Sequence, residues 1–591
     1  MSEETAGALT VRSMLIRFAI LLAVSCGVGM AGVFSGWLRV DQAIPCAVFI
    51  GIICGTLFFW NFRLAVAFLG LAVLMFTRSM DIPHFVTSCE LNVILFLVGM
   101  MVVVGALRDL GFFTWIVQLI VSMPNLTGWK FVSVTALASA LLACAVDEVT
   151  SIIFISTLIF QVCDRLKLDP TPYILIAVLC TNVGSSGTMM GNPVGILIGS
   201  KGNLSFGDFM MWAFPLMLAA LLATLALTLV IYRKSLREFD AKLQARLSQG
   251  LTLVPVISIP YKAGLTLLIL TVGAIASHHQ LEKLFSLAPN TVLYIAPLVC
   301  AGVVMICKPD RARHYIENEV DWWTLIFFMM LFAVAGTLTY TCVDQVMAAK
   351  FSNAAGSNKY TLVPLIFGSS AIGSAFVDNV IFVASFCPVI DQLAFSVQDM
   401  PLWWALLFGA CFGGNITMIG STANIVALGM LEKHAGKHMT FFRWLRVGAL
   451  ATVLSGAIAV CGILALERFM PDRFVRIGFD QIEQIIASGR NFKNKNVEIV
   501  ALLSADPRGE TREGFTAFTA GAPDRELRRQ FEPRIEVQIP DALLEKLGAD
   551  APRGSRPERR YVLRGRLTSF NNGELRLEVT KIVTMPRSAK K

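Results

Sequence analysis

The sequence predicts an all-α polytopic membrane protein with about 11 transmembrane helices in two inverted repeats with re-entrant hairpins and broken helices, followed by a small β-rich C-terminal soluble domain. Three observations lead to this prediction. Of the 591 residues, 55% are hydrophobic and only 15% are charged, whereas soluble domains carry about 25% charged residues. A glycine-rich break occurs twice within apolar sequence, and the composition changes after Pro471.

Apolar segments near the ~20 residues that cross a bilayer recur through the first 470 positions. The first follows a polar N-terminus and lacks a small-residue cleavage signature, so we expect residues 1–40 to keep it as an N-terminal transmembrane helix. The predicted spans outside the hairpins and breaks are 14–38, 44–60, 64–77, 91–107, 209–231, 262–277, 291–307, 322–340 and 444–466.

The two breaks repeat each other at an offset of 229 residues. GSSGTMMGNPVGIL at 184–197 aligns with GGNITMIGSTANIV at 413–426, and five positions are identical, among them Thr188/Thr417 and Gly191/Gly420. Non-helical backbone survives at membrane depth only where it lines a cavity or lies within protein. Paired breaks in the two halves of a chain therefore point to a substrate site.

The duplication extends upstream of the breaks. ILFLVGMMVVVGAL at 94–107 matches LIFFMMLFAVAGTL at 325–338, and AVDEV at 145–149 matches FVDNV at 376–380, both at offset 231. We therefore divide the membrane part into transport repeat 1 at 41–250 and transport repeat 2 at 251–470. The apolar runs around the two acidic motifs have arms of about fifteen residues, which is short for a crossing and predicts re-entrant hairpins.

Loop charges predict the orientation. Basic residues gather in the loops at 232–246, 308–313 and 432–446, which we place in the cytoplasm together with the N-terminus. The first repeat then has an odd number of crossings, so the second is inverted, which is the architecture of alternating access. The crossing count places residues 471–591 outside, whereas the arginines beside the last helix favour the cytoplasm, so the side of this domain stays open.

Residues 471–591 have a different composition, with no cysteine and only short apolar runs. Between 563 and 582 an Asn-Asn-Gly turn joins two alternating segments, which is a strong hairpin signal. We therefore predict a small soluble β-rich C-terminal domain of roughly 100 residues, within the usual size of a domain.

Three acidic residues lie inside apolar sequence at the hairpin tips: Asp147, Glu148 and Asp378. A carboxylate at membrane depth costs at least ~2.5 kcal/mol, so such residues mark ion or proton pathways. The recurrence of the aspartate in both repeats favours cation binding or proton exchange, with the two events coupled. The alternatives are that the tips lie in headgroup water or that the aspartates cap the second arms.

Hydroxyl and amide groups of the breaks are hard oxygen ligands suited to Na⁺, while half-helix N-termini favour an anion. The alternative is close helix packing through small residues. The predicted ion- or substrate-binding residues are Asp147, Glu148, Thr150, Ser151, Asn182, Ser185, Ser186, Thr188, Asn192, Asp378, Asn379, Asn415, Thr417, Ser421, Thr422 and Asn424. The predicted helix-break glycines are Gly184, Gly187, Gly191, Gly413, Gly414 and Gly420.

Other function classes have little support. The thirteen cysteines are scattered without a CxxC pair and the six histidines are sparse, so we expect no transition-metal site and no cofactor other than a bound Na⁺ at the same residues. No Walker A pattern is present, which argues against a fused ATPase. The net charge of +9 lies largely in orienting loops, so we expect the lipid bilayer rather than nucleic acid as a partner.

The region from about residue 90 to 466 resembles the ion transporter superfamily of citrate-transporter-like permeases, on its VDEV and GSSGTMMGNP motifs in the first half and its VDNV and GGNITMIGSTAN motifs in the second. That superfamily includes arsenite permeases, related sodium/proton antiporters and divalent-anion:sodium symporters. The resemblance implies secondary active transport by inverted repeats whose hairpin tips meet at the substrate site, often in a homodimer. The Asp-Glu and Asp-Asn tips are closer to the arsenite and antiporter branch than to the Ser-Asn-Thr tips of dicarboxylate symporters.

The leading hypothesis is an ion-coupled secondary transporter, not an enzyme, that exchanges Na⁺ or another small cation for H⁺ across a cell membrane, of prokaryotic inner-membrane type. One alternative is Na⁺- or H⁺-coupled transport of a small anion, such as citrate, another dicarboxylate or an oxyanion such as arsenite. A second is a transporter-derived sensor that signals through residues 471–591.

Overall fold

The computed structural model describes residues 11–59, 62–248, 261–287, 290–355, 358–394 and 397–471, and six strands beyond them. The chain divides into two compact units. One comprises Met1–Ile390 with Pro401–Glu467, and the other comprises Asp391–Met400 with Arg468–Lys591. The predicted boundary between the transport repeats, near 250, lies outside the described residues.

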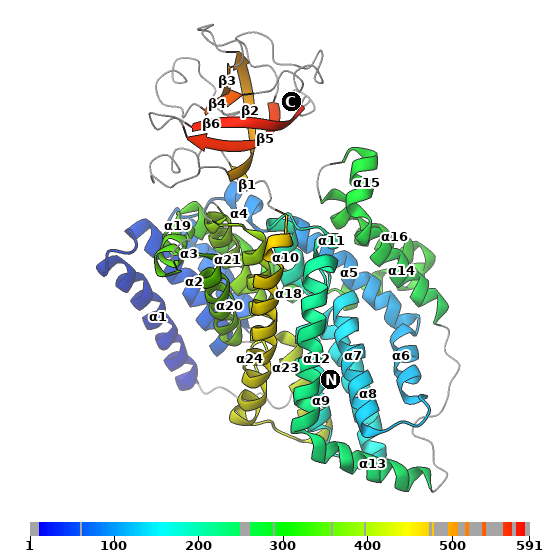
Figure 1. Ribbon diagram of the computed structural model, residues 1–591. Coiled ribbons are helices and arrows are strands. Elements are labelled where there is room, and N and C mark those ends of the chain that lie inside the picture. Colours follow the sequence, from blue (N-terminus) through cyan, green and yellow to red (C-terminus); the bar gives the residue numbers. More distant parts are fainter. Residues whose placement is uncertain are drawn as a thin grey trace. The chain divides into compact units, whose positions relative to one another are not determined.

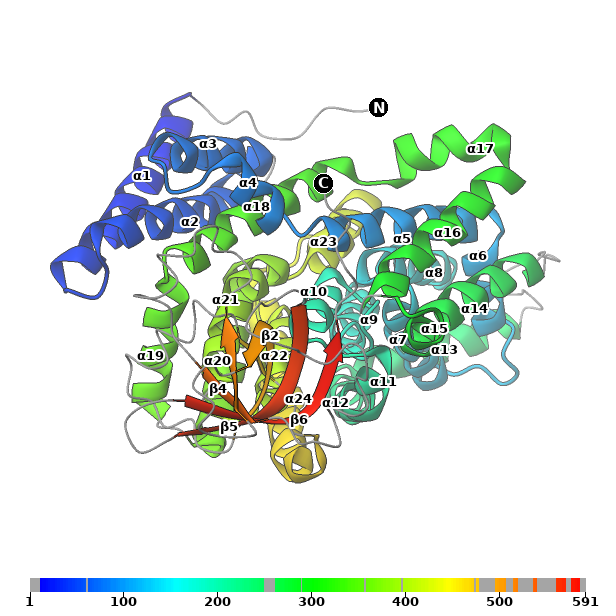
Figure 2. The ribbon, with the colours of Figure 1, turned by 90° about the horizontal axis from the view of Figure 1, so that it is seen from above.

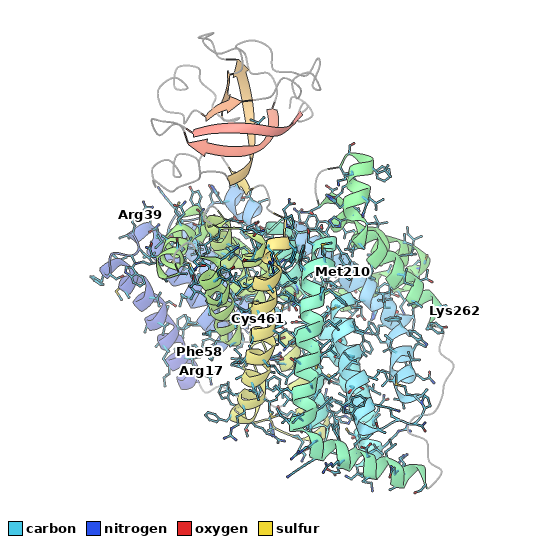
Figure 3. All side chains as sticks on the ribbon, in the orientation of Figure 1. Arg17, Arg39, Phe58, Met210, Lys262 and Cys461 are labelled. Carbon is cyan, nitrogen blue, oxygen red and sulfur yellow. The ribbon has the colours of Figure 1, made fainter. Side chains whose placement is uncertain are left out.

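The N-terminal helices form one flank of the first unit (Figure 2). They are α1 (Val11–Phe34), α2 (Val40–Phe58), α3 (Arg63–Phe76) and the short α4 (Ile82–Ser88). α1 packs on α2 and α2 packs on α3. Arg17 donates from Nη1 to the Phe58 carbonyl oxygen over 3.2 Å, which ties the start of α1 to the end of α2 (Figure 3).

The rest of the first half surrounds the first break. Its helices are α5 (Leu91–Asp109), α6 (Phe112–Val121), α7 (Gly128–Ala145), α8 (Glu148–Leu166), α9 (Thr171–Gly184), α10 (Pro193–Lys201), α11 (Phe206–Asp208), η2 (Phe209–Ala213), α12 (Phe214–Ile231) and α13 (Arg233–Leu247). α7 and α8 form a helical hairpin, and α9 packs against α7 (Figure 1).

The second half repeats this order around the second break. Its helices are α14 (Lys262–Ala276), α15 (His278–Phe285), α16 (Thr291–Cys307), α17 (Pro309–His314), η3 (Tyr315–Glu319), α18 (Trp322–Tyr340), α19 (Val343–Ala355), α20 (Lys359–Phe376), α21 (Asn379–Leu393), α22 (Met400–Gly413), α23 (Thr422–Ala435), α24 (Phe441–Leu466) and η4 (Glu467–Phe469). α24 packs along α12 of the first half (Figure 1).

Within the described residues, seven helices are long and apolar enough to cross a membrane, or eight if α14 and α15, which bend by 60°, form one span. The chain is therefore a multi-pass α-helical membrane protein, and the predicted eleven crossings stay a prediction. The arms of the first hairpin, α7 and α8, have 18 and 19 residues, longer than the predicted fifteen, because α7 already begins at Gly128 and α8 continues to Leu166. Both count among the seven, so their re-entrant character also stays a prediction.

The second unit contains one sheet. Its strands are β1 (Val475–Ile477), β2 (Lys495–Ala505), β3 (Gly514–Phe518), β4 (Ile535–Gln538), β5 (Arg560–Ser569) and β6 (Leu575–Thr584). β5 and β6 are antiparallel, with Leu563 opposite Ile582, while the turn predicted between them lies outside the described residues. Because β2 pairs with both β3 and β5, and β4 pairs with β6, the strands β2, β3, β4, β6 and β5 close into a ring.

Candidate functional site

The two predicted breaks are present as interruptions between short helices. α9 ends at Gly184 and α10 begins at Pro193, and α22 ends at Gly413 and α23 begins at Thr422. Each following helix starts from a side-chain cap. Asn192 Oδ1 accepts the Gly195 N–H over 2.9 Å, and Ser421 Oγ accepts the Ala423 N–H over 3.2 Å. Asn and Ser are preferred capping residues because their oxygens satisfy the first N–H groups of a helix.

A threonine in each break fixes that break to the hairpin of its own repeat. Thr188 donates its hydroxyl to the carbonyl oxygen of Cys144, near the end of α7. Thr417 donates to the carbonyl oxygen of Ala375, near the end of α20. The two contacts join positions that are equivalent in the two repeats, so the breaks have the same local architecture.

Glycines allow this close approach. A Cβ atom at Gly184 would lie 2.5 Å from the Ala140 carbonyl oxygen, and one at Gly413 would lie 2.5 Å from the Ala371 carbonyl oxygen. Both carbonyls belong to the first arm of the adjoining hairpin. Cβ atoms would also crowd their neighbours at Gly187, Gly191, Gly414 and Gly420.

A buried amide cluster joins the two halves of the chain. Asn182, on α9, donates from Nδ2 to Asn415 Oδ1 and to Asn424 Oδ1, both over 2.8 Å. Ser421 donates its hydroxyl to Asn182 Oδ1 over 3.0 Å. All four side chains are buried. The two breaks therefore meet, and the cluster connects residues more than 230 positions apart in the sequence.

The amides of the cluster also satisfy the irregular backbone. Asn424 Nδ2 donates to the carbonyl oxygens of Gly414 and Thr417, over 2.7 and 3.0 Å. Asn415 Nδ2 donates to the Leu179 carbonyl oxygen over 3.2 Å. Since buried backbone groups need partners, these side chains stabilise the unwound segment as well as facing the cluster.

Glu148, the first residue of α8, brings a carboxyl group to the cluster. Its side chain is only 6% exposed, and the Ser421 hydroxyl lies 3.3 Å from Oε1. Ser185 and Asn192 also interact with this carboxyl group. The charged side chains that act on it most strongly are Asp378 and Asp147, and both are acidic.

The donors around Glu148 all have second acceptors. Ser421 also donates to Asn182 Oδ1, and Ser185 donates to the Asn182 backbone carbonyl over 3.0 Å. Asn192 Nδ2 donates to Ser185 Oγ over 3.0 Å and to Cys411 Sγ over 3.3 Å. A hydroxyl carries a single proton, so an ionised Glu148 shares every one of these donors. A bound cation would compensate the charge of the carboxylate, and a proton on Glu148 would add the hydrogen-bond donor that the site lacks.

The two aspartates at the hairpin tips act as helix caps. Asp147 Oδ1 accepts the Thr150 N–H over 2.8 Å at the start of α8, and Asp378 Oδ1 accepts the Val380 N–H over 2.9 Å at the start of α21. The Thr422 hydroxyl also interacts with Asp378. Of the alternatives left by the sequence, capping is the one that these contacts match.

Each aspartate also has an arginine nearby. Arg108, at the end of α5, acts on Asp147, and Arg63, at the start of α3, acts on Asp378. Arg108 forms an ion pair with Glu319, with 2.9 Å between Nη1 and Oε2. The positive charge near each tip partly offsets the aspartate, whereas the strongest charged influences on Glu148 are both acidic.

Comparison with known proteins identifies the family. A family model described as "Citrate transporter" matches residues 49–409. The chain belongs to the citrate transporter family. It is a secondary transporter, and the matched region includes Glu148 and Asn182 of the cluster and ends shortly before the second break. The superfamily resemblance read from the sequence is therefore confirmed.

The chain is also similar to individual proteins. The uncharacterized transporter Rv2684 of Mycobacterium tuberculosis is 32% identical over 381 residues, which cover 63% of this chain and 85% of that protein. The P protein of Homo sapiens is 23% identical over 506 residues, covering 73% of this chain and 60% of that protein. The YdaH transporter of Alcanivorax borkumensis has 16% identity and a TM-score of 0.47 over 67% of this chain and 89% of its own.

Several predicted residues of this citrate-family transporter lie apart from the cluster. Ser151 donates to the Ser139 carbonyl oxygen over 2.6 Å inside the hairpin, and Ser186 donates to the Val183 carbonyl oxygen over 2.7 Å. Asn379 is buried at the start of α21. The threonines of the breaks face their own hairpins, as described above.

Sequence reasoning missed Cys411 as a member of the site. The thirteen cysteines are scattered in the sequence without a motif, yet Cys411 accepts a hydrogen bond from Asn192 and interacts with Glu148 and Ser185. The signal was available, because Cys411 follows Asn182 at the same 229-residue offset as the breaks. In the described part of the chain no three His, Cys, Asp or Glu side chains gather as metal ligands. The carboxylate that contacts the cluster is that of Glu148, and the other side chains of the cluster are neutral.

Proposed function

We propose that this transporter exchanges a small monovalent cation such as Na⁺ for H⁺ at Glu148. The main support is the buried carboxyl group of Glu148: the hydrogen-bond donors around it each have another acceptor. When Glu148 is ionised, its carboxylate, the Asn182 amide oxygen and the Ser421 hydroxyl offer hard oxygen ligands to the cation. When Glu148 is protonated, its own O–H supplies the missing donor. Cation and proton therefore compete for the same group.

Reciprocal contacts support alternating access by inverted repeats. Ser421 of the second repeat contacts Asn182 of the first, and Asn192 of the first contacts Cys411 of the second. At offset 229, Asn192 corresponds to Ser421, and Asn182 corresponds to Cys411. The contact between Ser421 and Asn182 is therefore repeated by the contact between Asn192 and Cys411. Such mutual exchange is the signature of a twofold relation. We infer that repeats 41–250 and 251–470 rock about this axis with the cluster at its centre.

A second candidate function is cation-coupled transport of a small carboxylate such as citrate. The family description favours it, and so does the start of α10 and α23 at the cluster, because helix N-termini attract anions. The acidic surroundings of Glu148 oppose it, since a multiply charged anion needs a positive partner in a desolvated site. The cation/proton reaction is the better supported of the two.

The test uses purified full-length protein in liposomes that contain a trapped pH dye. A jump in external Na⁺ or Li⁺ should change the luminal pH, and Glu148→Gln should abolish the change. Glu282→Gln is the matched control, because Glu282 is also buried but accepts the N–H groups of Asn290 and Val292 at the start of α16.

The outcomes separate the two candidate functions. A cation-dependent pH change that survives Glu148→Gln would reject Glu148 as the exchanging group. The absence of any pH change in correctly inserted protein would reject antiport. Radiolabelled citrate and other small carboxylates would then test the second candidate.

A further inference from the structure

The reciprocal contacts define two equivalent half-sites. The first consists of Glu148, Asn182 and Ser421, and the Ser421 hydroxyl lies 3.3 Å from Glu148 Oε1 and 3.0 Å from Asn182 Oδ1. Shifting these positions by the repeat offsets of 231 for the hairpin tip and 229 for the breaks gives Asn379, Cys411 and Asn192.

One contact joins two of the three positions of the second half-site. Asn192 Nδ2 lies 3.3 Å from Cys411 Sγ, which corresponds to the 3.0 Å contact between Ser421 Oγ and Asn182 Oδ1 in the first. Asn379, Cys411 and Asn192 are all buried. Cys411 and Asn192 therefore meet as their counterparts do, while Asn379 is buried at the start of α21, and the halves differ in the chemistry of their side chains.

The chemistry of the two halves differs at every position. The first half offers a carboxylate, an amide oxygen and a hydroxyl. The second offers an amide in place of the carboxylate, a thiol in place of the amide and an amide whose N–H groups are directed to Ser185 and Cys411. Small hard cations prefer oxygen ligands and negative charge, whereas thiol sulfur suits soft metals. The second half has no carboxylate, and it has a soft thiol where the first half has an amide oxygen.

Other acidic side chains near the cluster have different roles. Asp147 and Asp378 accept backbone N–H groups as caps, and Arg108 and Arg63 lie near them. Among the described residues, Glu148 is thus the carboxyl group that the Ser421 hydroxyl of the cluster reaches, and the charged side chains that act on it most strongly are both acidic.

We propose that the transporter binds one small cation per chain, at the half-site of Glu148, Asn182 and Ser421, and that the half-site of Asn379, Cys411 and Asn192 binds none. This inference rests on the proposed cation/proton function. One proton leaves Glu148 as one cation binds, and the reverse occurs on release. The charges balance, so the exchange is one for one and moves no net charge across the membrane.

Equilibrium binding of radioactive Na⁺ to purified full-length protein tests the stoichiometry directly. We expect one site per chain in the wild type and none in Glu148→Gln. The double variant Asn379→Glu with Cys411→Asn restores the hard ligands of the second half, and should bind two. Glu282→Gln, which changes a buried carboxyl group that accepts N–H groups at the start of α16, should still bind one and controls for folding.

The outcomes distinguish this inference from the proposed function. Two sites in the wild type would overturn the single-site inference while leaving cation transport intact. One site that persists in Glu148→Gln would overturn the assignment to the first half. No bound Na⁺ in the wild type would overturn both. In liposomes with the membrane potential clamped by K⁺ and valinomycin, an exchange rate that changes severalfold with the potential would contradict one-for-one exchange.

Discussion

The glycines at the ends of α9 and α22 offer a sharp test of the duplicated architecture. We predict that Gly184→Ala and Gly413→Ala impair the transporter to a similar degree. In both variants the new Cβ atom would lie 2.5 Å from a backbone carbonyl oxygen, that of Ala140 or Ala371. A backbone atom cannot rotate away, so the helix and the hairpin arm must separate.

The size of the effect follows from that distance. Ordinary Cβ contacts begin at 3.4 Å, so each break must move by about 0.9 Å, and overpacking of this kind costs about 1–3 kcal/mol. Alanine recovers up to about 1 kcal/mol through its helix propensity, and less at a helix end. The same movement displaces the residues that follow each glycine toward the cluster. A loss of 1.4 kcal/mol corresponds to about a tenfold lower rate.

The assay compares these variants with a harmless substitution. Gly429→Ala is the matched control, because a Cβ at this position of α23 meets nothing within 4 Å. Thermal unfolding midpoints in detergent and the cation-driven pH change in liposomes should fall in both test variants and stay unchanged or improve in the control. Wild-type values for Gly184→Ala together with impaired Gly413→Ala would refute the equivalence of the two breaks.

Two further predictions concern single side chains. Asn182→Leu should remove the donors to Asn415 and Asn424 and leave buried amide oxygens unpaired at about 1–3 kcal/mol each; a thermal midpoint equal to that of the wild type would contradict this. At Asp81, the N–H of His84 holds the carboxyl pKa below its ordinary value, so the cap stabilises α4 above that ordinary pKa and loses its effect as the pH falls through the lowered one. Hydrogen-exchange protection of α4 should therefore fall in acid, and Asp81→Asn, which caps without titrating, should remove this pH dependence.

Two adjacent acidic residues that the sequence analysis assigned to the same site have different roles in the structure. Glu148 and Asp147 are neighbours in the chain, yet one enters the cluster and the other caps the helix. Asp147 is the N-cap and has an extended backbone, whereas Glu148 is the first helical residue, so the two side chains face different surroundings. Substituting Asp147 and Glu148 separately is therefore more informative than replacing both.

The sequence by itself determined the features that are local in the chain. Apolar runs of sufficient length specify membrane helices because lipid leaves no other partner for the backbone. Glycines and small polar residues specify where α9 and α22 end, and Asn192 and Ser421 are capping residues by type. The nearly equal offsets of the two motifs, 231 and 229 residues, reveal the duplication in the sequence, because a repeat preserves the order of its elements.

Only the tertiary structure decided which of these residues meet. The bonds from Asn182 to Asn415 and Asn424 join positions 233 and 242 residues apart, and no periodicity within a segment encodes such a pairing. The entry of Cys411 into the site and the assignment of Glu148, rather than Asp378, to the cluster depend on the same crossing of the two halves. A polar side chain becomes a ligand or a cap according to the neighbours that packing supplies, and those neighbours come from distant parts of the chain.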